Sequence, residues 1–240
     1  MSRGLRPLAA VPRWVLALLA VSLTAQIALQ SQRDAGRATQ ADLPPAPPAP
    51  ALRLASFGEV EAGARLTMLY LQSFDYGGGN TAPYQNLDYT RLVEWLGSIL
   101  ELDPRSQYPL FAAARVYAET ADAARSRLAL EFVYREFLRD PNRRWPWLAH
   151  AALLAKHRLN DLPLARRYAQ ALERHTTARD VPLWARQMEI FILEDMNELE
   201  AAKIMLGGLL QSGVVHDPAE LRFLKQRLDE LEARLAGPKR

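Results

Sequence analysis

Four segments decide the fold of this chain: LVEWLGSILELDP (92–104), ALEFVYREFLRDP (129–141), ARRYAQALERHTT (165–177) and AKIMLGGLLQSGV (202–214). Aligned on Leu92, Ala129, Ala165 and Ala202, they recur at intervals of 37, 36 and 37 residues. Apolar residues within them are spaced by three and four, as on one face of a helix. A fixed period of this size indicates stacked helical units that bury a continuous core between neighbours.

A shared turn precedes the last two segments. LNDLPLA (159–165) and MNELEAA (196–202) have the same order of an apolar residue, Asn, an acid, Leu, two further residues and Ala. Asn suits the turn that ends one helix, and an acid is favourable at the N-terminus of the next helix. A small Ala lets the two helices approach closely. The sequence therefore predicts helix–turn–helix units.

The rest of the body also has helical rather than strand periodicity. No segment after residue 54 alternates apolar and polar residues, so an all-α fold is expected. The prolines at 104, 141 and 218 each follow an aspartate and mark helix boundaries. The last predicted helix would cap the final unit. The predicted helices cover 56–74, 87–102, 107–120, 122–139, 145–159, 162–176, 181–196, 198–212 and 218–236.

These units resemble the tetratricopeptide repeat (TPR) over residues 87–214. The resemblance implies an α-solenoid of about four helix–turn–helix repeats, in which the first helix of each unit lines a concave groove that binds a protein or peptide. The sequence departs from the family in three ways: its period exceeds about 34 residues, Asn replaces the turn Gly, and the closing Pro occurs only at Pro104 and Pro141. The segments 139–165 and 184–202 also resemble a family of uncharacterised single-span bacterial inner-membrane proteins, which implies a location in the cell envelope but no activity.

Helix periodicity separates two faces on the predicted helix 145–159. Leu148, Ala152, Ala155 and Leu159 form one stripe, which is expected to pack against the neighbouring helices. The opposite face and the TPR register both give the same groove residues, and the register extends them to both neighbouring units. Aromatic residues at helical spacing also suit a core stripe, exposed histidines on a helix are commonly plain polar surface, and an error of one residue would exchange the faces. The predicted groove residues are Trp147, His150, Leu154 and His157, with Phe111 and Ala114 before them and Trp184, Gln187, Phe191 and Glu194 after them.

The N-terminal part of the chain is predicted to lie outside the repeat domain. Residues 14–29, WVLALLAVSLTAQIAL, carry no charge and would span about 24 Å as a helix, which suits a short transmembrane anchor or a signal peptide. Arg3, Arg6 and Arg13 precede this segment, so the N-terminus is expected in the cytoplasm and the body in the periplasm. The expected organisation is a cytoplasmic segment 1–13, the anchor 14–29, a Pro-rich extended linker 30–54 and the repeat domain 55–236.

The distribution of charge argues against nucleic acid as a partner. Five arginines and two aspartates in residues 1–50 account for the whole formal charge of +3. Within the neutral body, residues 51–103 carry −4, residues 125–167 carry +6 and residues 186–202 carry −4. The centre of the basic region is a predicted patch for an acidic peptide or an anionic glycan. Charge pairing between repeats or contact with lipid headgroups would explain it equally well. The patch consists of Arg135, Arg139, Arg143 and Arg144.

No catalytic or metal-binding motif is evident. The chain has no Cys, which excludes disulfides, thiol catalysis and Cys-ligated metals. His150 and His157 lie two helical turns apart, too far to share one zinc ion, and the glycine run at 77–79 lacks the Lys-Ser/Thr of a phosphate loop. Neither a metal nor a cofactor is expected.

The sequence therefore predicts a non-catalytic, membrane-anchored adaptor for a protein or peptide in the bacterial cell envelope. Its oligomeric state stays open. Two alternatives remain: an all-helical glycan-processing enzyme that uses Glu194 or Asp195, and an adaptor of inverted topology that faces the cytoplasm.

Overall fold

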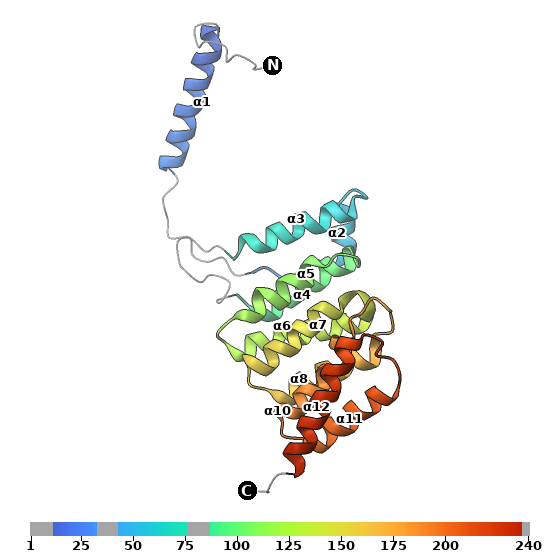
Figure 1. The fold of residues 1–240 in the computed structure, drawn as a ribbon. Helices are drawn as coiled ribbons and strands as arrows, with labels where there is room; N and C mark the ends of the chain where they lie inside the picture. Colours follow the sequence, from blue (N-terminus) through green and yellow to red (C-terminus); the bar gives the residue numbers. More distant parts are fainter. Residues whose placement is uncertain (1–11, 33–42, 76–86, 237–240) are drawn as a thin grey trace, which may run out of the picture.

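The computed structural model describes residues 12–32, 43–75 and 87–236, which are helical with no strand among them (Figure 1). Most of the predicted cytoplasmic segment, the first part of the linker and the glycine run lie outside these residues. A 3-10 turn, Tyr117–Glu119, follows the fifth helix. The helices are α1 (Arg13–Gln32), α2 (Ala49–Ala55), α3 (Val60–Ser73), α4 (Tyr89–Leu102), α5 (Tyr108–Arg115), α6 (Ala123–Arg139), α7 (Pro141–His157), α8 (Leu162–His175), α9 (Leu183–Arg186), α10 (Met188–Asp195), α11 (Leu199–Gln211) and α12 (Pro218–Ala236).

The helices of the body pack in chain order. Each helix from α2 to α12 contacts a neighbour in sequence, and further contacts join α4 to α6, α5 to α7 and α8 to α10. Figure 1 shows this progression from α2 and α3 at one end of the body to α11 and α12 at the other. The four aligned residues Leu92, Ala129, Ala165 and Ala202 lie on α4, α6, α8 and α11, and all four are fully buried. The small side chains thus lie where close packing needs them.

The predicted turn chemistry is confirmed at both asparagines. Asn160 and Asn197 adopt left-handed conformations, with φ of 50° and 60°, at the ends of α7 and α10. The residue after each asparagine donates a backbone hydrogen bond of 2.9 Å to the preceding helix, Asp161 to the Ala155 carbonyl and Glu198 to the Leu193 carbonyl. Asp161 also caps α8 by accepting from the Leu164 N–H at 3.0 Å.

The period of the sequence reappears in contacts between side chains. Gln72 bonds to the hydroxyl of Tyr108 at 2.8 Å, 36 residues further along the chain. The hydroxyl of Tyr168 donates to Glu131 at 2.9 Å across 37 residues. Equivalent positions of consecutive helix pairs therefore face one another, as stacking of similar units requires.

Four predicted helix boundaries differ from the structure. The helix predicted at 145 begins at Pro141, because proline is well suited to the first turn of a helix. The segment predicted as 181–196 is divided into α9 and α10 at Gln187. The helix predicted from 56 begins at Val60, after left-handed conformations at Phe57 and Gly58. The helix predicted as 107–120 ends at Arg115, and the 3-10 turn follows.

The predicted Pro-rich stalk is wrong for residues 43–54. Leu43 is only 1% exposed, and its carbonyl accepts a 2.6 Å hydrogen bond from Arg91 Nη1. Trp95 Nε1 donates to the Pro44 carbonyl at 2.8 Å. Prolines lack N–H donors but keep their carbonyls, so an extended proline segment can dock on a helix that supplies donors. The packed body thus includes residues 43–54, among them α2.

α1 covers the segment that the sequence predicts as an anchor. Its large apolar side chains are exposed on all sides, from Trp14 to Ile27. No helix in the described residues combines the length and the apolar character that crossing a membrane requires.

The C-terminal helix α12 completes a second apolar cluster. Its residues Leu224 and Leu231 are buried together with Ile190, Leu193 and Leu206 of α10 and α11. Most of the remaining surface of α12 is exposed and charged, as is typical of a capping helix in a repeat array.

Candidate functional site

Aromatic side chains form a continuous row across α5 and α7. The Tyr108 and Phe111 rings stack with centroids 6.0 Å apart, and Trp147 meets Phe111 edge to face at 5.7 Å. Gln107 fixes the indole of Trp147 by accepting from its Nε1 at 2.6 Å. Tyr108 and Phe111 remain exposed and Trp147 is half-buried. We call Tyr108, Phe111 and Trp147 the aromatic row.

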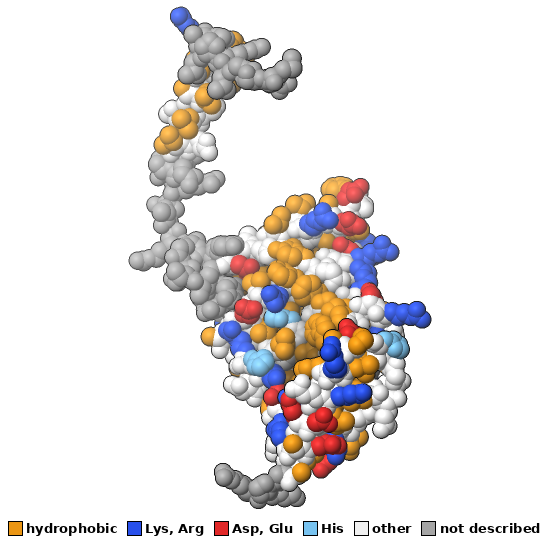
Figure 2. Space-filling model, viewed as in Figure 1, with side chains coloured by type: hydrophobic (Ala, Val, Ile, Leu, Met, Phe, Trp, Pro, Cys, Tyr) orange, Lys and Arg blue, Asp and Glu red, His pale blue; other side chains and the backbone are white. Residues whose placement is uncertain are grey.

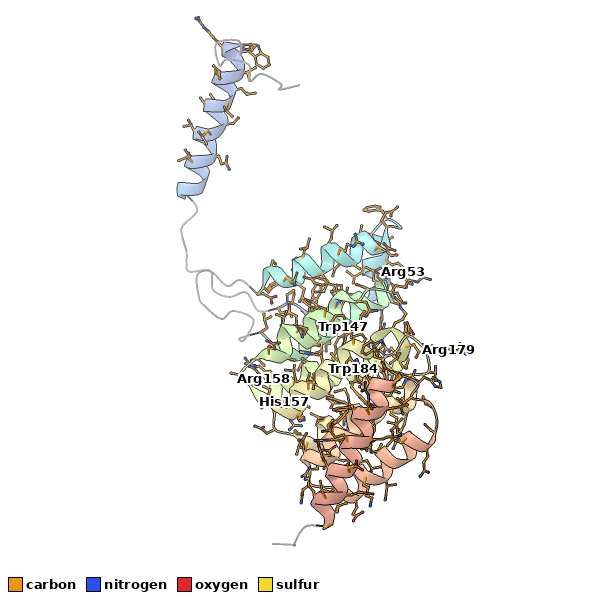
Figure 3. All side chains as sticks on the ribbon, viewed as in Figure 1. Arg53, Trp147, His157, Arg158, Arg179 and Trp184 are labelled. Atoms are coloured by element: carbon orange, nitrogen blue, oxygen red, sulfur yellow. The ribbon has the colours of Figure 1, made fainter. Side chains whose placement is uncertain are left out.

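The aromatic row lies on an apolar face of the body. Figure 2 shows hydrophobic side chains gathered across the middle of this face. Trp147 and Trp184 both lie in this middle region, between His157 and Arg158 at one edge and Arg179 at the other (Figure 3). Trp184 is half exposed and contacts Trp145 with ring centroids 5.6 Å apart. The surface predicted from Phe111 to Trp184 is thus largely open.

The other predicted groove residues of α7 differ in their surroundings. His150 lies beside Arg115, whose Nη1 donates to His150 Nδ1 at 3.2 Å. The pKa of the imidazole is lowered, mainly because the ring is partly buried and also because the Arg115 cation is close. Leu154 is half-buried against the core, and His157 is exposed at the edge. The predicted packing residues Leu148, Ala152 and Ala155 are fully buried and Leu159 is half-buried, so the predicted packing stripe is the buried face of α7.

The predicted groove does not continue as an open surface along α10. Gln187 is only 5% exposed and lies 3.4 Å from Glu220 of α12, while Phe191 contacts Phe223 of the same helix. Glu194 is buried, and both of its carboxylate oxygens accept from Arg227. α12 thus covers this side of α10, and these three residues make contacts within the chain. Ala114, also predicted for the groove, is fully buried on α5.

The acids considered for catalysis take part in ion pairs. Besides the contact of Glu194 with Arg227, Asp195 pairs with Lys156. The acids with a raised pKa lie elsewhere. Burial raises the pKa of Asp75 to about 6, although a 2.9 Å hydrogen bond from Tyr117 acts in the opposite direction. Burial, followed by the nearby Glu189, raises the pKa of Glu173. Among the described residues, no three His, Asp or Glu side chains lie close enough to hold a metal ion.

A pocket of about 790 Å³ lies where α2, α4, α6 and α7 meet. We call it the arginine pocket because five arginines line it: Arg53, Arg105, Arg139, Arg143 and Arg144. Three of these belong to the predicted basic patch. The fourth predicted member, Arg135, lines an adjoining pocket of about 390 Å³ that shares Glu101, Glu136 and Arg139 with the first.

The interior of the arginine pocket is built on a buried ion pair. Arg144 is 4% exposed, and its Nη1 donates to the Glu136 carboxylate at 2.8 Å and to the Glu136 carbonyl at 2.7 Å. Its Nη2 donates to the Pro104 carbonyl at 3.1 Å. Arg139 contacts the other oxygen of Glu136 at 2.8 Å. One carboxylate therefore serves two guanidinium groups.

Sequence reasoning missed Arg53 and Arg105. Arg53 lies in the segment that was expected to be a linker, and Arg105 follows Pro104 in a loop. The chain brings both to the basic patch through tertiary contacts: Arg53 Nη2 donates to the Glu101 carbonyl at 3.3 Å, and Arg143 Nη2 donates to the Arg105 carbonyl at 2.8 Å. No local pattern predicts these contacts.

Comparisons with protein families, with curated proteins and with solved structures found no match.

Proposed function

We propose that this protein is a non-catalytic adaptor that binds a peptide segment of a partner protein along the face of α5, α7 and α9. The observation that carries the proposal is the aromatic row, which leaves Tyr108 and Phe111 exposed beside Trp147 on two consecutive helix pairs. Aromatic side chains provide large, rigid contact areas and are enriched at the centres of protein interfaces. Trp184 extends the same surface.

The proposed architecture is a TPR-like α-solenoid of about four helix–turn–helix units. Support comes from the buried residues at intervals of 36 and 37, from Asn160 and Asn197 in equivalent turns, and from contacts between equivalent positions. In such an array, one helix of each pair lines a continuous surface on which an extended ligand can lie. α3, α5, α7 and α9 would hold these positions, and α12 would cap the array.

Photo-crosslinking in intact cells tests the adaptor proposal. A benzoylphenylalanine at Phe111 is expected to give a discrete adduct with a partner, because this side chain lies exposed in the aromatic row. The matched control is the same substitution at Leu153, which is equally exposed but lies on another side of α7. Equal adducts from both positions, or none from Phe111 in a folded protein, would contradict the proposal.

We further propose that α1 attaches the protein to the bacterial inner membrane, with the N-terminus in the cytoplasm and the helical body in the periplasm. The support is the all-round apolar surface of α1 and the arginines that precede it. The protein is expected in the membrane fraction after alkaline washing, and a reporter fused after Arg240 is expected to be active only in the periplasm. Activity of a cytoplasmic reporter at the same position would overturn this topology.

A further inference from the structure

We propose that the arginine pocket binds carboxylate side chains of an acidic segment in the partner peptide. This inference rests on the proposed adaptor function and names the chemistry of the partner. It depends on three observations: an excess of guanidinium groups in the pocket, a lining that mixes charged and apolar surface, and the position of the pocket next to the aromatic row.

The pocket holds more guanidinium groups than its own carboxylates neutralise. Arg139 and Arg144 share Glu136, and Arg143 pairs with Asp140 at 3.5 Å. Neither Arg53 nor Arg105 takes part in an ion pair within the described part of the chain, and those of the pocket involve its other three arginines. The planar guanidinium fork matches a carboxylate in bidentate geometry, and this charge-assisted pairing is stronger than a neutral hydrogen bond. The carboxylate of a ligand could accept hydrogen bonds from the remaining N–H donors of these two side chains.

The lining favours a peptide over a bare anion or a continuous polyanion. The pocket lining also includes three apolar residues, of which Ala49 and Leu100 are buried and Pro50 is exposed, and the Pro50 ring suits the methylene groups of Glu side chains. A volume of about 790 Å³ also accommodates several side chains rather than one small ion. Glu101 also lines the pocket, and its carboxylate would repel a polyanion that carries a negative charge on every monomer. Spaced carboxylates avoid that repulsion.

The pocket and the aromatic row are neighbours on the same elements. Arg143 and Trp147 are four residues apart on α7, so their side chains emerge on the same side of the helix. Arg105 lies three residues before Tyr108, which is the first residue of α5 and begins the aromatic row. A peptide whose apolar side chain contacts the aromatic row would thus reach the pocket with an acidic residue close by. The N-terminus of α7 at Pro141 adds a favourable helix dipole for a negative group.

Fluorescence anisotropy on the full-length protein tests this inference. The probe is a labelled peptide of alternating Leu and Glu, and its counterpart replaces each Glu by Gln. The Glu peptide is expected to bind at least roughly tenfold more tightly than the Gln peptide, and the double variant Arg53→Gln/Arg105→Gln is expected to remove most of this preference. Because neither arginine pairs with a carboxylate among the described residues, the variant should keep the wild-type melting temperature.

The control variant is Arg179→Gln, which removes an exposed arginine in the loop between α8 and α9, at the same edge of the body as Arg53 (Figure 3). It should bind both peptides as the wild type does. Equal affinity for the two peptides, or a preference that survives the double variant, would overturn the inference. So would binding of inorganic phosphate or of phosphatidylglycerol vesicles that requires Arg53 and Arg105 while the peptides show no preference.

The failures of the two proposals are distinguishable. If benzoylphenylalanine at Phe111 forms a specific adduct but peptide binding ignores the arginines, only the carboxylate inference is wrong. If the Glu peptide binds through Arg53 and Arg105 while Phe111 forms no adduct, the pocket stands and the aromatic row is not the partner surface.

Discussion

Replacing Arg144 with alanine is expected to lower the free energy of unfolding by about 3–5 kcal/mol, the usual cost of removing one partner from a buried ion pair. Arg144 is 4% exposed and donates to the carboxylate and carbonyl of Glu136 and to the carbonyl of Pro104. Without it, the Glu136 carboxylate remains buried with Arg139 as its ion-pair partner. Urea denaturation of the full chain, followed by circular dichroism, measures the loss.

Two further variants test whether the buried ion pair causes the loss of stability in Arg144→Ala. Arg139→Ala should cost less than about 1 kcal/mol, because its side chain is largely exposed and the Arg144 pair stays intact. The double variant Arg144→Met/Glu136→Leu should recover most of the loss from Arg144→Ala, since no buried carboxylate is then left with only the exposed Arg139 to neutralise it. If Arg144→Ala costs no more than Arg139→Ala, the pair is not a structural support of the arginine pocket.

The turns after α7 and α10 and the buried small residues could be predicted from the sequence because local chemistry indicates them. A tight turn after a helix favours a left-handed residue, and Asn160 and Asn197 adopt that conformation. Close helix packing needs small side chains at fixed intervals, and Ala129, Ala165 and Ala202 supply them. The turn depends on adjacent residues, and the small residues recur at nearly equal intervals, so both can be recognised in the sequence pattern.

The docked proline segment could not be predicted in the same way. Proline content alone indicates an extended conformation, which residues 43–48 do adopt. Whether that extended chain stays in solvent depends on donors elsewhere, here Arg91 and Trp95 on α4. The position of Arg53 in the arginine pocket could not be predicted for the same reason, because Arg53 belongs to α2, which directly follows this segment.

The predicted groove shows a similar limit at its C-terminal end. The helical register correctly separated the buried face of α7 from the face of Trp147. The same register placed Gln187, Phe191 and Glu194 on one side of the next predicted helix, but a register does not show which other helix packs against that side. α12 covers it, and its own sequence predicted a cap without stating which residues the cap would contact.

Replacing Arg227 with alanine tests how α12 is attached, and it is expected to cost about 3 kcal/mol of unfolding free energy. Arg227 donates to both oxygens of Glu194, whose side chain is 3% exposed.

After the substitution, Glu194 retains a contact with Arg234 at 3.8 Å, too long for a good hydrogen bond. Because α11 and α12 belong to an apolar cluster distinct from the main core, hydrogen exchange should accelerate first in these two helices, while α4 to α7 keep their protection. Lys225→Ala, an exposed position on the same helix, is the matched control and should leave exchange unchanged. Uniform acceleration across all helices would show that the array unfolds as a single unit. Unchanged exchange in α12 would show that its apolar contacts with α10 and α11 hold it without the ion pair.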